Sequence, residues 1–379
     1  MISVNRRQPL YRKLYNYVLE QIEEGRLGPG DRVPSEKELS GRFKVSRITS
    51  KRALEMLASE GTIVRVPGKG SFITESAHGG SAPHTAGAKS GLLMGCVVAD
   101  VDDAFGTRLL YGIEQQFSEL GYHLVLHLSH DQAAAEERAI AGLLEAGIQG
   151  LLIMPCHGEH YNPAVLKLVL DRFPLVFIDR YLRGLAASSV GTDNVVAAKR
   201  GVDYLIELGH TAITFVSSPP GNTSTIEERL EGFVKSHADH GMVSDQELRL
   251  EILKGGHPLH WTMADVRAEI DLAAGHLIAH PEITAVFASE YSVAKIVELA
   301  AGEIGRRIPE ELSLICFDQP MRYDLEPHFT HLRQRELEIG RKASQIAHDL
   351  ASGSLEFEKI RLDADLMVGR TTAPPFRPT

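Results

Sequence analysis

The sequence predicts two folds in one chain: an N-terminal winged helix-turn-helix of α+β type, and a C-terminal two-lobed, doubly wound α/β domain. Charge divides the chain, because residues 1–75 hold 14 Lys or Arg against 9 Asp or Glu while the whole 379-residue protein has a net charge of −10. Apolar runs alternating with helical patterns over residues 91–379 indicate βαβ units. Between them, "SAHGGSAPHTAGAKS" at 76–90 has the composition of a flexible linker.

The first 75 residues predict three helices and a hairpin. In "PLYRKLYNYVLEQIEEG" one helical face is apolar, and Gly25 ends the helix. Ser35 and Glu38 form a capping box that begins a second helix, and Ser46 is the expected N-cap of a third. The stretch "TIVRVPGKGSFIT" alternates as two short strands around a tight turn. Three helices followed by a hairpin are typical of a winged helix-turn-helix.

The third helix carries the predicted contacts to double-stranded DNA. Its first turns hold Arg47, Thr49, Lys51 and Arg52, and N-terminal turns of a recognition helix reach base edges in the major groove. Arg can bind guanine through two hydrogen bonds, and Lys can bind guanine or phosphate. Lys69 lies at the apex of the hairpin between two glycines, so we expect it to approach the DNA backbone.

The stretch "PSEKELSGRFKVSRITSKRALEMLASEG" followed by "GKGSF" resembles the GntR-type winged-helix domain of bacterial transcription regulators, over residues 8–73. Carried over by position, the resemblance implies DNA contacts from Lys37, Arg47, Thr49, Lys51 and Gly68. This chain has Lys at positions 37 and 51, where the family usually has Arg. Those differences bear on which operator sequence is preferred.

The remaining 289 residues predict a sheet-rich domain with buried strands. Seven runs are apolar almost throughout, as in strands covered on both faces of a parallel sheet. They are "LLMGCVVA", "HLVLHLS", "GLLIMP", "LVFID", "ITFVS", "TAVFAS" and "LSLICFD". This length exceeds one ordinary doubly wound sheet, so we expect two lobes with a cleft between them.

Polar and aromatic residues follow the ends of these strands, where ligands bind in open α/β sheets. Carboxylates and guanidinium groups suit the paired hydroxyls of a sugar, and an aromatic plane covers its C–H face. The candidates are Asp102, Phe105, Asp179, Arg180, Arg229, Trp261, Ser289, Glu290, Asp318 and Gln334. Taken singly, such a carboxylate is more often a helix N-cap, and a lone Trp is more often a packing residue.

The motifs "LVFIDR", "LIELGHTAITFVSS", "RLEGF", "TAVFASE", "IPEELSLICFDQP" and "THLRQRELEIG" resemble the effector domain of LacI/GalR repressors, which is related to periplasmic sugar-binding proteins. The resemblance covers residues 91–372. It implies an effector pocket at Phe105, Asp179 or Arg180, Arg229, Trp261, Ser289, Asp318 and Gln334. A GntR-type DNA-binding domain joined to such an effector domain resembles the arrangement of arabinose-responsive repressors. This resemblance implies a homodimer that responds to L-arabinose or a related pentose.

Other functions stay open or are disfavoured. The sequence contains no G-x-S-x-G, P-loop or G-x-G-x-x-G motif, so we expect no enzyme and no cofactor. Scattered histidines near "HLSH" and "CHGEH" predict no metal site. Three distant cysteines, no signal peptide and no membrane-length apolar run favour the cytoplasm. An activator or dual regulator that responds to another sugar or small metabolite remains the alternative to a repressor.

Overall fold

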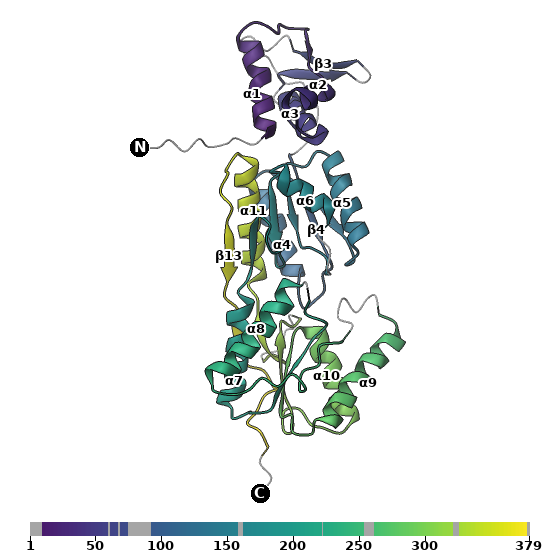
Figure 1. Ribbon diagram of the computed structural model, residues 1–379, viewed down its shortest axis with the longest axis vertical. Helices are drawn as coiled ribbons and strands as arrows, with labels where there is room; N and C mark the ends of the chain where they lie inside the picture. The colour runs from purple at the N-terminus through teal and green to yellow at the C-terminus, as the bar shows by residue number, and fades with distance from the viewer. Residues whose placement is uncertain are drawn as a thin grey trace, which may run out of the picture.

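The computed structural model describes residues 10–59, 61–66, 69–74, 92–157, 162–221, 223–253, 261–320 and 326–376. In this part of the chain, three bodies follow one another along a single long axis, with the N-terminal domain at one end (Figure 1). The C-terminal domain supplies the other two bodies, which we call lobe 1 and lobe 2. The predicted linker at 76–90 lies outside the described residues, and the predicted domain boundaries stay a prediction.

The N-terminal domain has the predicted winged helix-turn-helix fold. Its antiparallel sheet has the order β1-β3-β2. Its elements are α1 (Leu10–Glu23), β1 (Arg32–Val33), α2 (Glu36–Phe43), α3 (Arg47–Ser59), β2 (Ile63–Val66) and β3 (Gly70–Ile73).

Local signals explain where these helices begin and what they bury. Ser35 and Glu38 form the expected capping box at the start of α2. Ser46 Oγ accepts a hydrogen bond from the main-chain N of Thr49 at 3.2 Å, which caps α3. The apolar face of α1 packs into the domain core through Leu14 and Val18, both fully buried.

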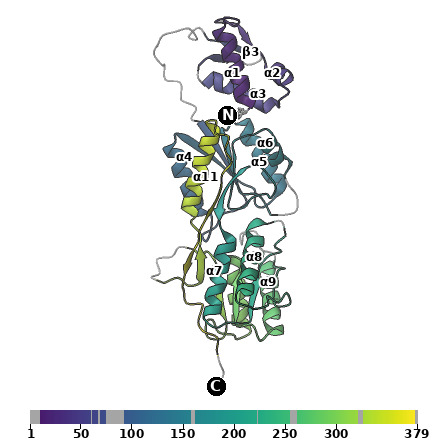
Figure 2. The same cartoon turned by 60° about the vertical axis from the view of Figure 1, so that its left-hand side comes forward.

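Lobe 1 contains a six-stranded parallel sheet of order β13-β8-β7-β6-β4-β5. Helices α4 and α11 cover one face of this sheet, and α5 and α6 cover the other (Figure 2). Its elements are β4 (Leu92–Val98), α4 (Thr107–Glu119), β5 (Tyr122–Leu128), α5 (Ala133–Glu145), β6 (Gly150–Ile153), α6 (Pro163–Leu170), β7 (Leu175–Ile178), β8 (Ser188–Thr192), α11 (Glu336–Ala351) and β13 (Lys359–Leu362).

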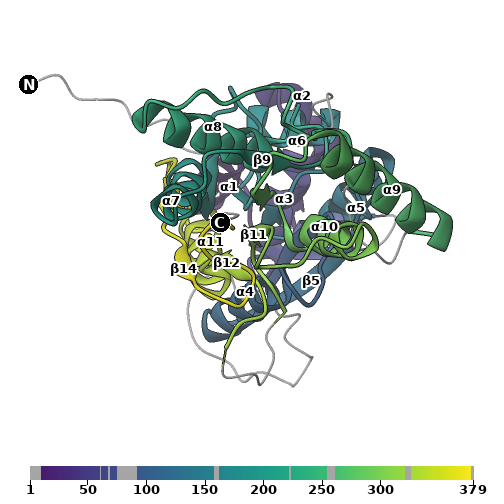
Figure 3. The same cartoon turned by 90° about the horizontal axis from the view of Figure 1, so that it is seen from below.

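Lobe 2 contains a five-stranded sheet of order β14-β12-β11-β10-β9, in which only β14 runs antiparallel to its neighbour. Viewed from below, α7 and α8 lie on one side of this sheet and α9 and α10 on the other (Figure 3). Its elements are α7 (Asn194–Glu207), β9 (Ile213–Val216), α8 (Ser224–Asp239), α9 (Met263–Ala279), β10 (Ala285–Ala288), α10 (Tyr291–Glu303), β11 (Ser313–Phe317), β12 (Thr330–Arg333) and β14 (Asp365–Met367).

The chain passes between the two lobes three times. The first passage joins β8 to α7, the second joins β12 to α11, and the third joins β13 to β14. Each lobe is therefore assembled from segments that are distant in sequence. The cleft between the lobes is bounded by these passages and by the carboxyl ends of the parallel strands, where polar residues were predicted.

Helices α4 and α11 approach each other so closely that their backbones touch. A Cβ atom on Gly112 would collide with the carbonyl of Leu337, and one on Gly340 would collide with the carbonyl of Leu109. Glycine at both positions therefore fixes how α11, which arrives late in the sequence, packs on the first helix of lobe 1.

Candidate functional site

A cleft of about 610 Å³ lies between the lobes. Nine of the ten predicted effector residues line it: Asp102, Phe105, Asp179, Arg180, Arg229, Trp261, Glu290, Asp318 and Gln334. Ser289 lies just behind the lining, where its carbonyl accepts a hydrogen bond from Arg229. These residues were predicted because they follow strand ends, where ligands bind in open α/β sheets. The fold brings them together although some lie more than 200 positions apart in the sequence. Their contact with a ligand stays a prediction.

Arg229 is the cation on the lobe 2 side of the cleft. It lies in α8, and only 6% of its surface is exposed. Its Nε donates to Asn194 Oδ1 at 2.9 Å, and Nη1 donates to the carbonyl of Ser289 at 2.7 Å. The guanidinium lies 3.8 Å from the ring centroid of Phe317. Burial lowers the pKa of Arg229, an effect that nearby carboxylates oppose.

Asp318 is a buried carboxyl held in place by Gln334. It follows β11 in a left-handed backbone conformation, with φ at 56°. The main-chain N of Gln334 donates to Asp318 Oδ1 at 3.0 Å, and Gln334 Nε2 donates to Oδ2 at 2.6 Å. Gln334 Oε1 accepts from Thr192 Oγ1, which ties the pair to lobe 1. Burial raises the pKa of Asp318 to about 7, despite the hydrogen bonds from Gln334 that lower it.

Asp179 and Arg180 provide the matching pair on lobe 1. Both follow β7, and the φ of Asp179 is 60°. Burial raises the pKa of Asp179, while Arg180 and Arg229 act against that shift. Among the described residues, Asp179 Oδ1 and Arg180 Nε are buried atoms with no hydrogen-bond partner. Arg180 Nη1 is 3.6 Å from Asp131 Oδ1. An acceptor and a donor without partners are thus adjacent at the cleft wall.

The remaining predicted residues differ in how far their side chains are already engaged by contacts within the protein. Asp102 Oδ1 already accepts hydrogen bonds from the main-chain N of Ala104 and of Phe105, as a turn-forming Asp does. Burial raises the pKa of Glu290, whose Oε1 accepts from Ser292 Oγ. Trp261 is partly buried against the core of lobe 2 and still borders the cleft.

Several lining residues were not predicted, although they obey the same rule. His130 and Asp131 follow β5, His157 follows β6, and Thr223 and Thr225 follow β9. Arg180 and burial lower the pKa of His157 to about 3, which keeps this imidazole neutral. His157 Nδ1 lies 3.3 Å from Thr223 Oγ1, so the two lobes touch across the cleft. Scanning the residues after every predicted strand would have found all five.

The predicted DNA contacts divide into an exposed and a covered group. Lys37 on α2, Arg47 at the start of α3 and Lys69 in the turn before β3 are exposed. Gly68 lies outside the described residues. The exposed cations come from two helices and the wing, which are the elements expected to follow a DNA backbone.

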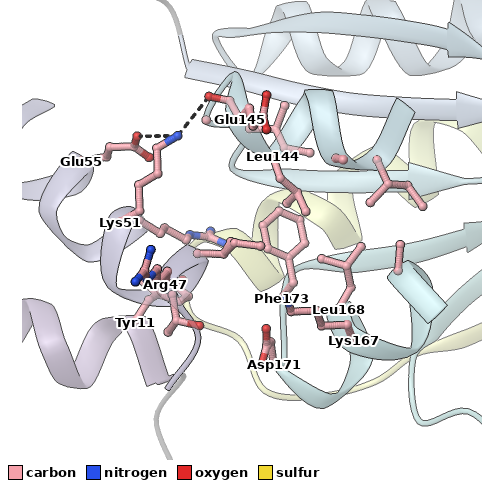
Figure 4. A pocket seen from close by; sticks show the side chains of 18 of the residues that line it. Tyr11, Arg47, Lys51, Glu55, Leu144, Glu145, Lys167, Leu168, Asp171 and Phe173 are labelled. Carbon is pink, nitrogen blue, oxygen red and sulfur yellow. Dashed lines mark hydrogen bonds and ion pairs between the residues drawn. The ribbon is translucent and has the colours of Figure 1, made fainter. Parts of the chain in front are cut away.

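Thr49 and Arg52 are buried, and Lys51 is half-buried with its ammonium group bonded to lobe 1. Thr49 is buried, with its Oγ1 2.9 Å from Ser46 Oγ. Lys51 Nζ donates to the carbonyl of Glu145 in lobe 1, as Figure 4 shows. Arg52 is buried against lobe 1 with only 6% of its surface exposed. In this arrangement Lys51 and Arg52 would reach DNA only after the domain and lobe 1 separate, and their DNA contacts stay a prediction.

The described residues contain no group of three or more His, Cys, Asp or Glu side chains that could hold a metal ion. Of the cysteines, Cys96 and Cys316 are buried and Cys156 is partly buried. Within the same described ranges, no helix is long and apolar enough to cross a membrane. The cleft instead offers hydrogen-bond donors and acceptors of both charges.

Comparison with known protein families identifies both parts of the chain. Residues 10–73 match the gntR family of bacterial regulatory proteins. Residues 202–372 match the periplasmic binding protein-like domain. The resemblances inferred from the sequence motifs are therefore confirmed for both folds.

Two relatives extend over both parts. The arabinose metabolism transcriptional repressor of Halalkalibacterium halodurans is 25% identical over 344 residues, covering 88% of each chain. Its namesake from Geobacillus stearothermophilus is 25% identical over 345 residues, covering 89% of this chain and 90% of the other. The ribose operon repressor of the first organism is 24% identical over 286 residues, which cover 75% of this chain and 80% of its own.

Solved structures of transcription regulators resemble about three quarters of the chain in fold. The transcription regulator CcpA of Lactococcus lactis has a TM-score of 0.64 and 20% identity, covering 74% of this chain and 99% of its own. A LacI family regulator from Enterococcus faecium, solved with bound ribose, has a TM-score of 0.59 and 22% identity. The match covers 74% of this chain and 99% of that one. At this identity the likeness establishes the fold.

Proposed function

Because the chain joins a GntR-type helix-turn-helix domain to a periplasmic-binding-protein-like domain, we propose that it is a transcriptional repressor whose operator binding is relieved by a small neutral sugar. L-arabinose or a related pentose is the proposed effector. The two arabinose repressors support this choice, since each aligns with this chain through both domains. The proposal includes no catalysis and a cytoplasmic location, where the operator lies.

The observation that carries the proposal is the mixture of charges in the cleft. Arg180 and Arg229 face the carboxyl groups of Asp179, Glu290 and Asp318. Such donors and acceptors match neighbouring hydroxyl groups, each of which both donates and accepts a hydrogen bond. The described lining of the cleft holds six carboxyl groups against two guanidinium groups, so it lacks the excess of positive charge that an anionic ligand would need. A neutral polyol therefore suits this cleft better than a sugar phosphate or a sugar acid.

The proposed mechanism requires two copies of the chain on two operator half-sites. Sugar bound between the lobes would favour one angle between them, because the three interlobe passages are the segments able to bend. A change in that angle alters the distance between the two DNA-binding domains, and half-site spacing is a geometric requirement of such dimers. The sugar can shift operator binding only by as much as its affinity differs between the two arrangements.

Calorimetry on the full chain tests the effector. L-arabinose, D-ribose, D-xylose and a phosphorylated pentose would be titrated separately, and operator fragments selected from random DNA would then be bound with and without the sugar that gives heat. Saturable binding of a neutral pentose that also releases the operator supports the proposal. Selective binding of the phosphorylated sugar would contradict it. Sedimentation of the chain with and without operator checks the dimer.

A second candidate is an activator or dual regulator that responds to a different sugar or small metabolite. Relatives named only as HTH-type transcriptional regulators favour it, such as PtxS of Pseudomonas aeruginosa, which is 27% identical over 285 residues. Transcription in vitro from the selected operator separates the candidates. A repressor lowers transcript yield without sugar, whereas an activator raises it.

A further inference from the structure

The face of the predicted DNA-reading helix α3 that carries Lys51 and Arg52 lies against lobe 1, whereas Arg47 at its start is exposed. Figure 4 shows α3 across a cavity from α5, α6 and the loop before β7. The cavity has a volume of about 430 Å³. Lobe 1 lines it with apolar side chains, including Leu144, Leu168 and Phe173. This junction covers the part of α3 that carries Lys51 and Arg52, two of the predicted DNA contacts.

Two cations of α3 donate to main-chain carbonyl groups of lobe 1. Lys51 Nζ lies 3.2 Å from the carbonyl oxygen of Glu145, the last residue of α5. Arg52 Nη2 donates to the carbonyl oxygen of Gln149 at 2.7 Å. The last carbonyls of a helix lack partners within the helix and carry partial negative charge. The carbonyl oxygen therefore attracts the Lys51 ammonium group as a DNA phosphate would, but more weakly, because it carries only a partial negative charge.

Helix α1 also donates hydrogen bonds to main-chain carbonyl groups, at the C-terminal end of α11 in lobe 1. Tyr11 Oη donates to the carbonyl of Ala351 at 3.2 Å, and Arg12 Nη2 donates to that of Ser352 at 3.1 Å. These carbonyls close the C-terminal end of α11. The winged domain thus contacts the C-terminal ends of two helices through Lys51, Arg12 and Tyr11, while Arg52 contacts the loop between α5 and β6.

The contact satisfies Arg52 only in part. Its guanidinium carbon lies 4.0 Å from the ring centroid of Tyr11 and 5.0 Å from that of Phe173. Its Nε and Nη1 are buried without a hydrogen-bond partner in the described part of the chain. Burial also lowers the pKa of Arg52. A buried guanidinium with unfilled donors is a contact that a phosphate-rich partner can displace.

We propose that this junction is an autoinhibitory contact, in which lobe 1 competes with operator DNA for Lys51 and Arg52. The inference rests on the proposed function, because it requires an operator. The same nitrogen atoms cannot bind the lobe 1 carbonyls and DNA at once, because both partners would need the same face of α3. Apparent operator affinity is then the intrinsic affinity reduced by the fraction of molecules in which the domain is released.

Phe173→Ala tests the junction without changing any predicted DNA contact. Loss of the ring beneath Arg52 should favour release and tighten operator binding about fivefold. Leu170→Ala is the matched control, because Leu170 ends α6 and is 81% exposed. Acylation of lysines by a limiting reagent, followed by mass spectrometry, reports release independently. Lys51 should react faster in Phe173→Ala, relative to the exposed Lys37 of the same domain.

Tyr11→Phe gives a second variant on the opposite side of the junction. It removes the hydrogen bond to Ala351 and keeps the ring, so operator binding should tighten about twofold. If Phe173→Ala melts without cooperativity, this variant decides the question alone.

The outcomes separate the inference from the function on which it rests. Faster Lys51 labelling together with tighter operator binding supports the competition. Equal labelling in the variants and the unmodified chain overturns the contact, and faster labelling without tighter binding overturns the competition. If no variant binds DNA while labelling still differs, the domain contact stands and both the competition and the proposed function fall.

Discussion

The cleft and the junction each bury an arginine under an aromatic ring, but they surround it differently. Arg229 lies 3.8 Å from the Phe317 centroid and donates to Asn194 and Ser289. Arg52 lies 4.0 Å from the Tyr11 centroid and has one carbonyl acceptor. The carboxyl groups of Asp179, Asp318 and Glu290 lie near the first arginine, whereas the second lies between the rings of Tyr11 and Phe173. The difference separates a site organised for a polar ligand from a contact between domains that must be able to break.

The largest expected effect is on the cleft. Arg229→Ala removes a charge-assisted donor and leaves sugar hydroxyls and buried carboxyls unmatched, a loss of about 2–3 kcal/mol. Sugar affinity should fall about 30- to 150-fold. Operator binding without sugar should survive, so the variant should stay bound at sugar levels that release the unmodified protein.

The control for that variant is Arg307→Ala, which breaks an exposed ion pair to Glu311 outside the cleft and the interlobe passages. Calorimetry, operator release and thermal melting would be measured on both. If Arg229→Ala lowered the melting temperature and kept normal sugar affinity, its role would be to hold the lobes together.

The next effect concerns base recognition. Arg47 is exposed on the first turn of α3. Arg47→Ala should weaken operator binding by about 1–3 kcal/mol and relax preference at one operator position. Selection from randomised operators with both proteins measures this. Unchanged sequence preference would contradict the assignment of Arg47 to a base edge.

The third effect is a pH dependence at Asp318, whose folded pKa is about 7 against an ordinary value of 3.8. If its carboxylate accepts from a sugar hydroxyl, sugar affinity should fall by up to about tenfold per unit as pH drops below 7. The stability of the sugar-free protein should depend on pH in the opposite direction. Between these two pKa values the folded chain binds a proton that the unfolded chain lacks, so stability should decrease as pH rises through this window.

Asp318→Asn sharpens that prediction. The variant should lose both pH dependences and bind sugar weakly at pH 8, because its amide cannot ionise and keeps only one acceptor oxygen for the two donors of Gln334. Calorimetry and thermal melting from pH 5 to 8 provide the measurement. A sugar affinity independent of pH in the unmodified protein would exclude Asp318 as an ionised acceptor.

The smallest effect is expected at the wing. Lys69→Ala removes one exposed cation without a predicted base contact. Binding should weaken by less than about 1 kcal/mol on every sequence, and the salt dependence should become shallower by about one counterion. Titration of two unrelated duplexes over several salt concentrations tests this. A loss confined to one sequence would make Lys69 a reader of bases.

Sequence reasoning predicted which residues lie at the cleft where one local rule decides their position in the fold. Asp179, Arg229 and Asp318 were found because parallel strands present their carboxyl ends to a common edge. Strands β8 and β12 were not among the predicted runs, because "SSVGT" and "THLR" are too short and polar to stand out. Their burial depends on helices that come from elsewhere in the chain.

The position of Arg52 shows a kind of contact that sequence patterns do not predict. Its place on α3 follows from helix periodicity, and its exposure was expected from the apolar residues opposite. What covers it is Phe173, from a different domain more than 100 residues away. No local pattern encodes that contact, since it depends on how two separately folded bodies meet.

The three passages between the lobes also constrain the order of synthesis. Helix α11 and strand β13 complete the core and edge of lobe 1, yet they are translated after nearly all of lobe 2. The apolar faces of α4 and β4 therefore lack their partner helix while some 200 further residues leave the ribosome. Until α11 emerges, the nascent chain exposes a surface that chaperones recognise, whereas the winged domain is complete and can fold within the first hundred residues.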